Sequence, residues 1–69
     1  MEDIIRRKIG KARAKIAMLK VNLRATDYMA IKYAEGEISS SEYAETKAKR
    51  KQWRTEINMY EEQIKALRG

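Results

Sequence analysis

The sequence predicts an all-α fold, an antiparallel hairpin of two long helices with a short helix at the corner, in a single domain over residues 1–69. Two observations carry this prediction. Proline is absent and alanine, lysine, glutamate and arginine dominate the composition, which favours helix along the whole chain. Two apolar seams also recur in alternating steps of three and four residues, the spacing of helices that bury one face against a partner helix.

The first seam predicts a long helix over about residues 3–25, and the second predicts another over about residues 40–68. The first seam contains Ile5, Ile9, Ala12, Ile16, Leu19 and Leu23. The second contains Trp53, Ile57, Tyr60, Ile64 and Leu67, and it continues backwards through Arg50, Thr46 and Tyr43. When the two seams run in opposite directions, their apolar residues fall beside each other, and Leu67 then lies beside Ile5. The sequence therefore favours antiparallel pairing.

The segment between the seams predicts the corner. Thr26 or Asp27 has a side chain that can cap a short helix over about residues 27–35, although the first helix can also continue through this segment. Gly36 follows at the place where a helix C-terminus needs a positive φ. We therefore expect a turn over residues 36–39.

The start of the second long helix carries the strongest local signal in the chain. Ser39, followed three residues later by Glu42, forms the pattern of a capping box, in which each side chain accepts from the other residue's backbone N–H. Ile38 and Tyr43 occupy the positions of the hydrophobic staple that often accompanies this cap.

A second apolar stripe runs along the first helix, roughly opposite its seam. A hairpin monomer has no use for two apolar faces on one helix. Small domains usually need an additional source of stability, and the absence of cysteine and histidine excludes disulfides and the usual zinc sites. We therefore expect a helical homo-oligomer, with an interface that contains Gly10, Ala14, Met18, Val21 and Ala25. Closure of the hairpin within one chain or by exchange between chains stays open, because the same seams serve both arrangements.

The net charge of +6 is unevenly distributed along the chain. Residues 1–24 carry eight basic and two acidic side chains, residues 25–45 carry one and five, and residues 46–69 carry seven and three. A hairpin brings the two basic thirds together, and such a body attracts phosphates. Five cations near the bend are the candidate phosphate ligands: Lys20, Arg24, Lys47, Arg50 and Arg54.

Aromatic side chains near the same bend offer ring faces on which bases stack. The candidates are Tyr28, Tyr33, Tyr43 and Trp53. A purely structural interpretation is also open, since Trp53 fits the seam as a core residue and the lysines fit a solvated face. Arg50 takes a seam position opposite Leu23, where it either snorkels to solvent, faces a ligand, or pairs with Glu35 or Glu45.

Residues 26–58 contain, in order, Thr-Asp-Tyr, Ile-Lys, Glu-Gly, a Ser/Glu-rich turn, Glu-Tyr, Arg-x-x-x-Arg and Ile-Asn. With these motifs the segment resembles a recurrent helical segment of phage and prophage proteins that are often tail-associated. The matching residues are Thr26, Asp27, Tyr28, Ile31, Lys32, Glu35, Gly36, Glu42, Tyr43, Arg50, Trp53, Arg54, Ile57 and Asn58. The resemblance implies a viral origin and a helix–turn–helix form, and it implies no activity.

No catalytic residue, metal or cofactor is expected, because no histidine is present to activate a serine and no glycine-rich loop is present to hold phosphates. We predict a non-enzymatic phage-type protein that binds or sequesters an anionic nucleotide ligand, either a cyclic nucleotide signal or nucleic acid, to counter a host defence. The alternative is a structural coiled-coil module of a phage particle or a protein-binding adaptor. No apolar run approaches the ~20 residues of a membrane span, so no membrane partner is expected, and the expected location is the cytoplasm of an infected bacterium.

Overall fold

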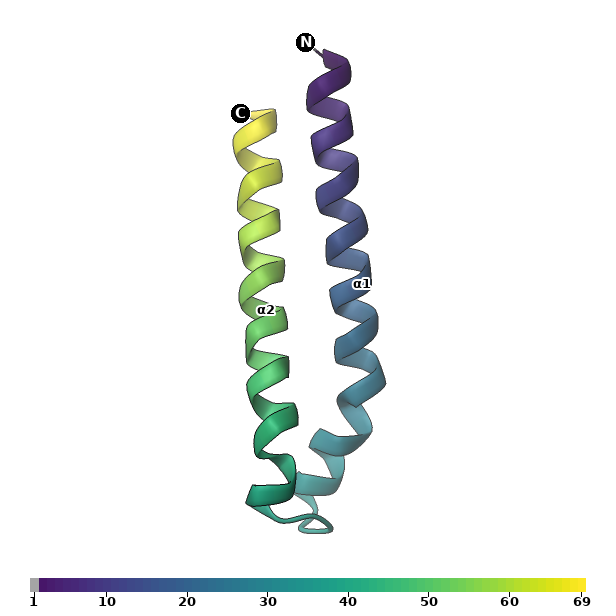
Figure 1. The fold of residues 1–69 in the computed structure, drawn as a ribbon, viewed down its shortest axis with the longest axis vertical. Coiled ribbons are helices and arrows are strands. Elements are labelled where there is room, and N and C mark those ends of the chain that lie inside the picture. Colours follow the sequence, from purple (N-terminus) through teal and green to yellow (C-terminus); the bar gives the residue numbers. More distant parts are fainter. Residues whose placement is uncertain (1) are drawn as a thin grey trace.

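The computed structural model describes residues 2–69, which form two long helices joined by a short turn (Figure 1). Helix α1 spans Glu2–Ala34 and helix α2 spans Ser40–Arg68. The helices run antiparallel, so the two chain ends lie at one end of the molecule, the open end, and the turn lies at the other end, the corner. The hairpin measures 52 × 15 × 14 Å. The predicted all-α antiparallel hairpin is confirmed.

The two predicted seams face each other between the helices. The least exposed residues all belong to these seams and are Ala12, Leu19, Tyr43, Arg50 and Ile57, at 4 to 8% exposure. The other seam residues are half-buried. No side chain within residues 2–69 falls below 2% exposure. Two helices alone therefore build a thin core, one side chain deep from each helix.

The predicted short helix over residues 27–35 is wrong as a separate element, because α1 continues through it to Ala34. Thr26 does not cap a new helix. Its hydroxyl donates to the carbonyl oxygens of Asn22 and Leu23, at 2.9 and 3.1 Å. A threonine bonded back to its own helix is compatible with helix and tends to bend it, and α1 bends toward α2 near the corner (Figure 1). Thr26 and Asp27, which predicted the start of a new helix, therefore mark a bend within α1.

Gly36 ends α1 as predicted, with φ +78°. The backbone N–H of Glu37 donates to the carbonyl of Lys32 at 2.8 Å, and that of Gly36 donates to Tyr33 at 3.1 Å. This pair of bonds is the Schellman motif, which satisfies carbonyls that the helix end leaves open. The turn covers residues 35–39 and is one residue longer than predicted.

The predicted capping box at the start of α2 is confirmed. The backbone N–H of Glu42 donates to Ser39 Oγ at 3.1 Å, and the backbone N–H of Ser39 donates to Glu42 Oε1 at 3.3 Å. Ile38 is half-buried and Tyr43 is buried, as the staple positions require. The cap sets the first residue of α2, so the predicted bounds of 40–68 agree with the structure.

Replacing Ser39 with alanine is expected to lower the free energy of unfolding by about 1 kcal/mol, because the first turn of α2 loses its side-chain acceptor. Urea unfolding followed by circular dichroism, at one fixed protein concentration, measures the change. Ser40→Ala is the matched control, since the Ser40 hydroxyl makes no side-chain hydrogen bond within the described chain. Equal effects of the two substitutions would contradict the assignment of the cap.

Candidate functional site

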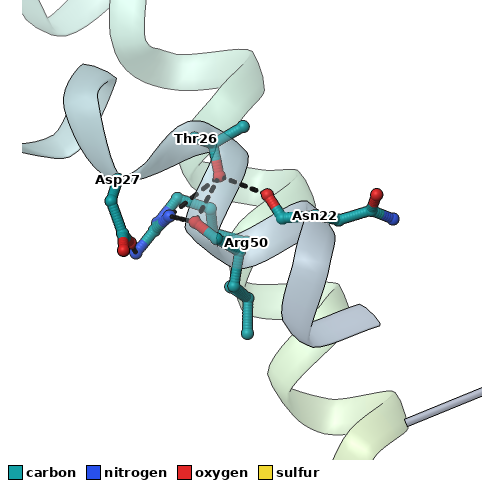
Figure 2. Close-up of polar contacts among 5 residues, drawn as sticks. Asn22, Thr26, Asp27 and Arg50 are labelled. Atoms are coloured by element: carbon teal, nitrogen blue, oxygen red, sulfur yellow. Dashed lines mark hydrogen bonds and ion pairs between the residues drawn. The ribbon is translucent and has the colours of Figure 1, made fainter. Parts of the chain in front are cut away.

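Arg50 is the most constrained polar residue near the corner (Figure 2). Its side chain crosses from α2 to α1, where Nη1 donates to the carbonyl of Leu23 at 2.7 Å and to Thr26 Oγ1 at 2.8 Å. Nη2 donates to Asp27 Oδ1 at 2.9 Å. The arginine side chain is only 9% exposed, whereas the aspartate side chain is 52% exposed. One guanidinium therefore connects the two helices through three acceptors on α1.

This contact also accounts for the local shape of α1. A side chain that reaches into the hydrogen-bond ladder of a helix is a recognised cause of a bend, and Arg50 reaches the Leu23 carbonyl in mid-helix. The Nε–H of Arg50 is buried and has no acceptor within residues 2–69. An unsatisfied buried donor costs ~1–3 kcal/mol, and the three charge-assisted bonds of the same guanidinium offset this cost.

The structure corrects two predictions about Arg50. Its acidic partner is Asp27, and the predicted pairing with Glu35 or Glu45 is wrong; Glu45 instead lies 3.2 Å from Lys49 Nζ on its own helix. The predicted role of Arg50 as a phosphate ligand conflicts with this geometry, because the guanidinium is buried and directed at protein acceptors. Any ligand phosphate would have to meet the exposed cations.

The four predicted stacking residues do not converge on a common pocket. Tyr33 and Tyr43 stack on each other, with ring centroids 4.7 Å apart and planes 14° apart. Trp53 is half-buried in the seam. Tyr28 is 58% exposed, and Lys32 Nζ lies 5.8 Å from the centroid of its ring. Each ring therefore already has a protein neighbour or faces open solvent.

Two open grooves flank the helix pair, and both lie toward the open end. One, of about 490 Å³, is lined by Arg13, Ile16 and Lys20 from α1 and by Glu61, Ile64, Lys65, Arg68 and Gly69 from α2. The other, of about 460 Å³, is lined by Lys8, Lys11, Ala12 and Lys15 from α1 and by Tyr60, Gln63, Ala66 and Leu67 from α2. These grooves lie on opposite sides of the seam, and neither includes a residue of the corner.

Helical periodicity shows that the side of the seam with the first groove, lined by Arg13 and Lys20, continues along the whole hairpin. Residues seven apart on a helix share a side. On α1 this series is Arg6, Arg13 and Lys20, and on α2 it is Lys47, Arg54, Glu61 and Arg68. Arg24 follows Lys20 by one turn, and Lys51 precedes Lys65 by two heptads, so both join the same side.

We call this surface the basic edge, and its cations are Arg6, Arg13, Lys20, Arg24, Lys47, Lys51, Arg54, Lys65 and Arg68. All nine are exposed. The acidic residues on the same side are Asp3, Asp27 and Glu61. Four of the five predicted phosphate residues lie on this edge, and only Arg50 is buried. The sequence interpretation missed the extension toward the open end, which the seven-residue spacing of the cations could have indicated.

The predicted oligomer residues lie on the outer face of α1, which points away from α2. Gly10, Ala14 and Ala25 are exposed, and Met18 and Val21 are 51% and 54% exposed. Helix α1 continues to Ala34, so no separate short helix packs on this stripe. The stripe therefore has no cover within the hairpin.

No family model matches the chain, and no curated protein or solved structure matches it either. The resemblance to phage and prophage segments consequently stays a prediction. Across residues 2–69, neither helix is long and apolar enough to cross a membrane. The same residues contain no group of three or more acidic, cysteine or histidine side chains placed to hold a metal ion.

Arg50→Ala is expected to lower the free energy of unfolding by about 2–4 kcal/mol, because a buried side chain and three hydrogen bonds are lost together. Arg54→Ala removes the same chemical group one turn further along α2, from an exposed position, and we expect a change within about 0.5 kcal/mol. Urea unfolding of both variants at one protein concentration tests the difference. Equal small losses would contradict a structural role for Arg50.

Proposed function

We propose that the chain is a non-enzymatic protein that binds strands of RNA or DNA through the phosphate backbone, with the basic edge as the contact surface. The observation that carries the proposal is the distribution of charge: nine exposed cations and three acids lie on one side of the hairpin, and the cations come from both helices. The excess of six charges on this edge equals the net charge of the whole chain.

The shape of this surface favours a linear ligand. The hairpin is 52 Å long, and the cations of the edge run from Arg6 and Arg68 near the open end to Lys47 near the corner. A nucleic-acid strand presents a regular line of phosphates, about one per 3.4 Å of each strand in a duplex, so an extended row of cations meets several of them at once. Binding of this kind positions a backbone and carries little sequence information.

A cyclic nucleotide is the less favoured ligand. Such a molecule needs a pocket in which a few cations and ring faces converge. Around the corner, Arg50 is directed at α1, and Tyr33 and Tyr43 are stacked on each other. The two open grooves lie elsewhere. A role in countering host defence stays a prediction from the size and composition of the chain, and strand binding is compatible with it.

A second candidate function is a structural or interaction module, and two observations favour it. Arg50, the polar residue most unexpected in the seam, serves to connect the helices. The outer face of α1 carries exposed apolar side chains that suit protein contact. In this case the basic edge contributes solubility and binds strands no better than any cationic surface does.

Fluorescence anisotropy with a labelled 20-nucleotide strand at low salt tests the first proposal. We expect Lys20→Gln combined with Arg54→Gln to weaken binding, and the magnitude of the log–log salt slope to fall by about 1.4, since each phosphate contact to a single strand contributes ~0.7. Lys8→Gln combined with Lys15→Gln removes the same charge from the opposite side of the seam, and it should leave the slope unchanged.

Ligand length provides a further readout of the same experiment. Affinity should rise from a 6-mer to a 20-mer, because more cations of the edge engage. Equal losses in the two double variants would favour the structural module, and so would an absence of strand binding at low salt. A cyclic dinucleotide that binds more tightly than the 20-mer would contradict the linear-ligand proposal.

A further inference from the structure

The outer face of α1 carries a continuous apolar stripe that the hairpin itself cannot cover. Its residues recur in steps of four and three and are Ala14, Met18, Val21, Ala25 and Tyr28. Met18, Val21 and Tyr28 are each more than half exposed, as is Ile31 beside them at 57%. Because the seam occupies the opposite side of α1, helix α2 of the same chain cannot reach this stripe.

The accessible surface of the chain is too large for a compact monomer of its mass. The area is 5533 Å² for a mass of 8.1 kDa, whereas a folded monomer of this mass exposes about 4,500 Å². The excess is on the order of 1,000 Å², and a stable interface of standard size buries about 800 Å² on each partner. The radius of gyration agrees: it is 15.7 Å, against about 11 Å for a compact domain of this length.

We infer that the partner on this face is a second copy of the chain, and that the two α1 helices pair antiparallel about a twofold axis. The stripe is self-complementary in this arrangement. The twofold axis crosses the α1 pair at a height midway between residues 19 and 20. Met18 of one copy then lies opposite Val21 of the other, and Ala14 lies opposite Ala25. The larger side chains fill the centre, and the alanines on both flanks let the backbones approach closely.

Charge favours the antiparallel direction. In this register residues 2–14 of one copy lie beside residues 25–37 of the other. The first segment carries five basic and two acidic side chains, and the second carries one basic and three acidic side chains. Antiparallel pairing therefore places a basic segment beside an acidic one, whereas parallel pairing places like charges together. In the same register Lys11 lies opposite Tyr28 of the second copy, and Arg7 lies opposite Lys32, with Glu35 about one helical turn beyond it.

This inference is independent of the proposed strand binding. The pairing covers the outer face of α1 and leaves exposed most of the basic edge, including Arg13, Lys20 and all of its cations on α2. Failure of one proposal therefore leaves the other in place.

Sedimentation equilibrium over a range of protein concentrations tests the association. We expect the native chain to give twice its 8.1 kDa mass and Val21→Glu to raise the dissociation constant at least a hundredfold. Met59→Glu is the matched control, since Met59 is an exposed apolar residue of α2 with 49% exposure, and it should leave the dimer intact. A monomeric native chain, a mass of three or more copies, or equal effects of the two substitutions would overturn the inference.

Disulfide trapping tests the direction of pairing even if Val21→Glu fails to fold. The described chain contains no cysteine, so introduced thiols report only their own contacts. Mixed Ala14→Cys and Ala25→Cys chains should form a disulfide-linked dimer under mild oxidation, and each variant alone should cross-link at least tenfold less. Efficient self-linking of Ala14→Cys would indicate a parallel pair and overturn the inference, as would absence of the mixed product.

Discussion

The single seam between α1 and α2 is the constraint on which the rest of this structure depends. Two helices bury one stripe each, and the least exposed seam side chains, Ala12, Leu19, Tyr43, Arg50 and Ile57, still retain 4 to 8% exposure. A core this thin supplies little stability of its own. The chain therefore depends on well-satisfied helix ends, with the Schellman motif at Gly36 and the capping box at Ser39 closing the corner from both sides.

Arg50 interrupts the apolar seam, and its contacts give the corner a defined geometry. Placing a guanidinium in a partly buried seam costs desolvation, which good hydrogen-bond geometry has to offset. Here Leu23, Thr26 and Asp27 accept from it within 2.7 to 2.9 Å. Polar residues at seam positions are known to specify register. The same contact coincides with the bend of α1, so the shape of the corner and the alignment of the helices share one origin.

The heptad pattern also determines where the charges lie. Seven-residue spacing sends Arg6, Arg13 and Lys20 to one side of α1, and antiparallel pairing brings them beside Arg54 and Arg68 of α2. The result is a rod with a basic edge, a seam, and an outer apolar face on α1, and these three surfaces do not compete for the same side chains. Strand binding and self-association, as proposed above, would therefore be compatible in one small molecule.

Local chemistry in the sequence determined most of the elements. The seams predicted the two helices and their direction, and the pairing of Ser39 with Glu42 predicted the first residue of α2, because caps and periodicity act over a few residues. The tertiary structure decided what needs contact between distant segments. Thr26 carried the signal of a helix cap, yet it bonds back to Asn22 and receives Arg50, so α1 bends where a break was predicted. The partner of Arg50 was likewise decided by packing, because Asp27 is brought within reach only when the seams align. The sequence did contain one indication of this contact, since Thr26 continues the α1 seam by one step. The predicted stacking rings were separated in the same way, since the stacking of Tyr43 on Tyr33 joins α2 to the end of α1 in the folded corner and follows from no local motif.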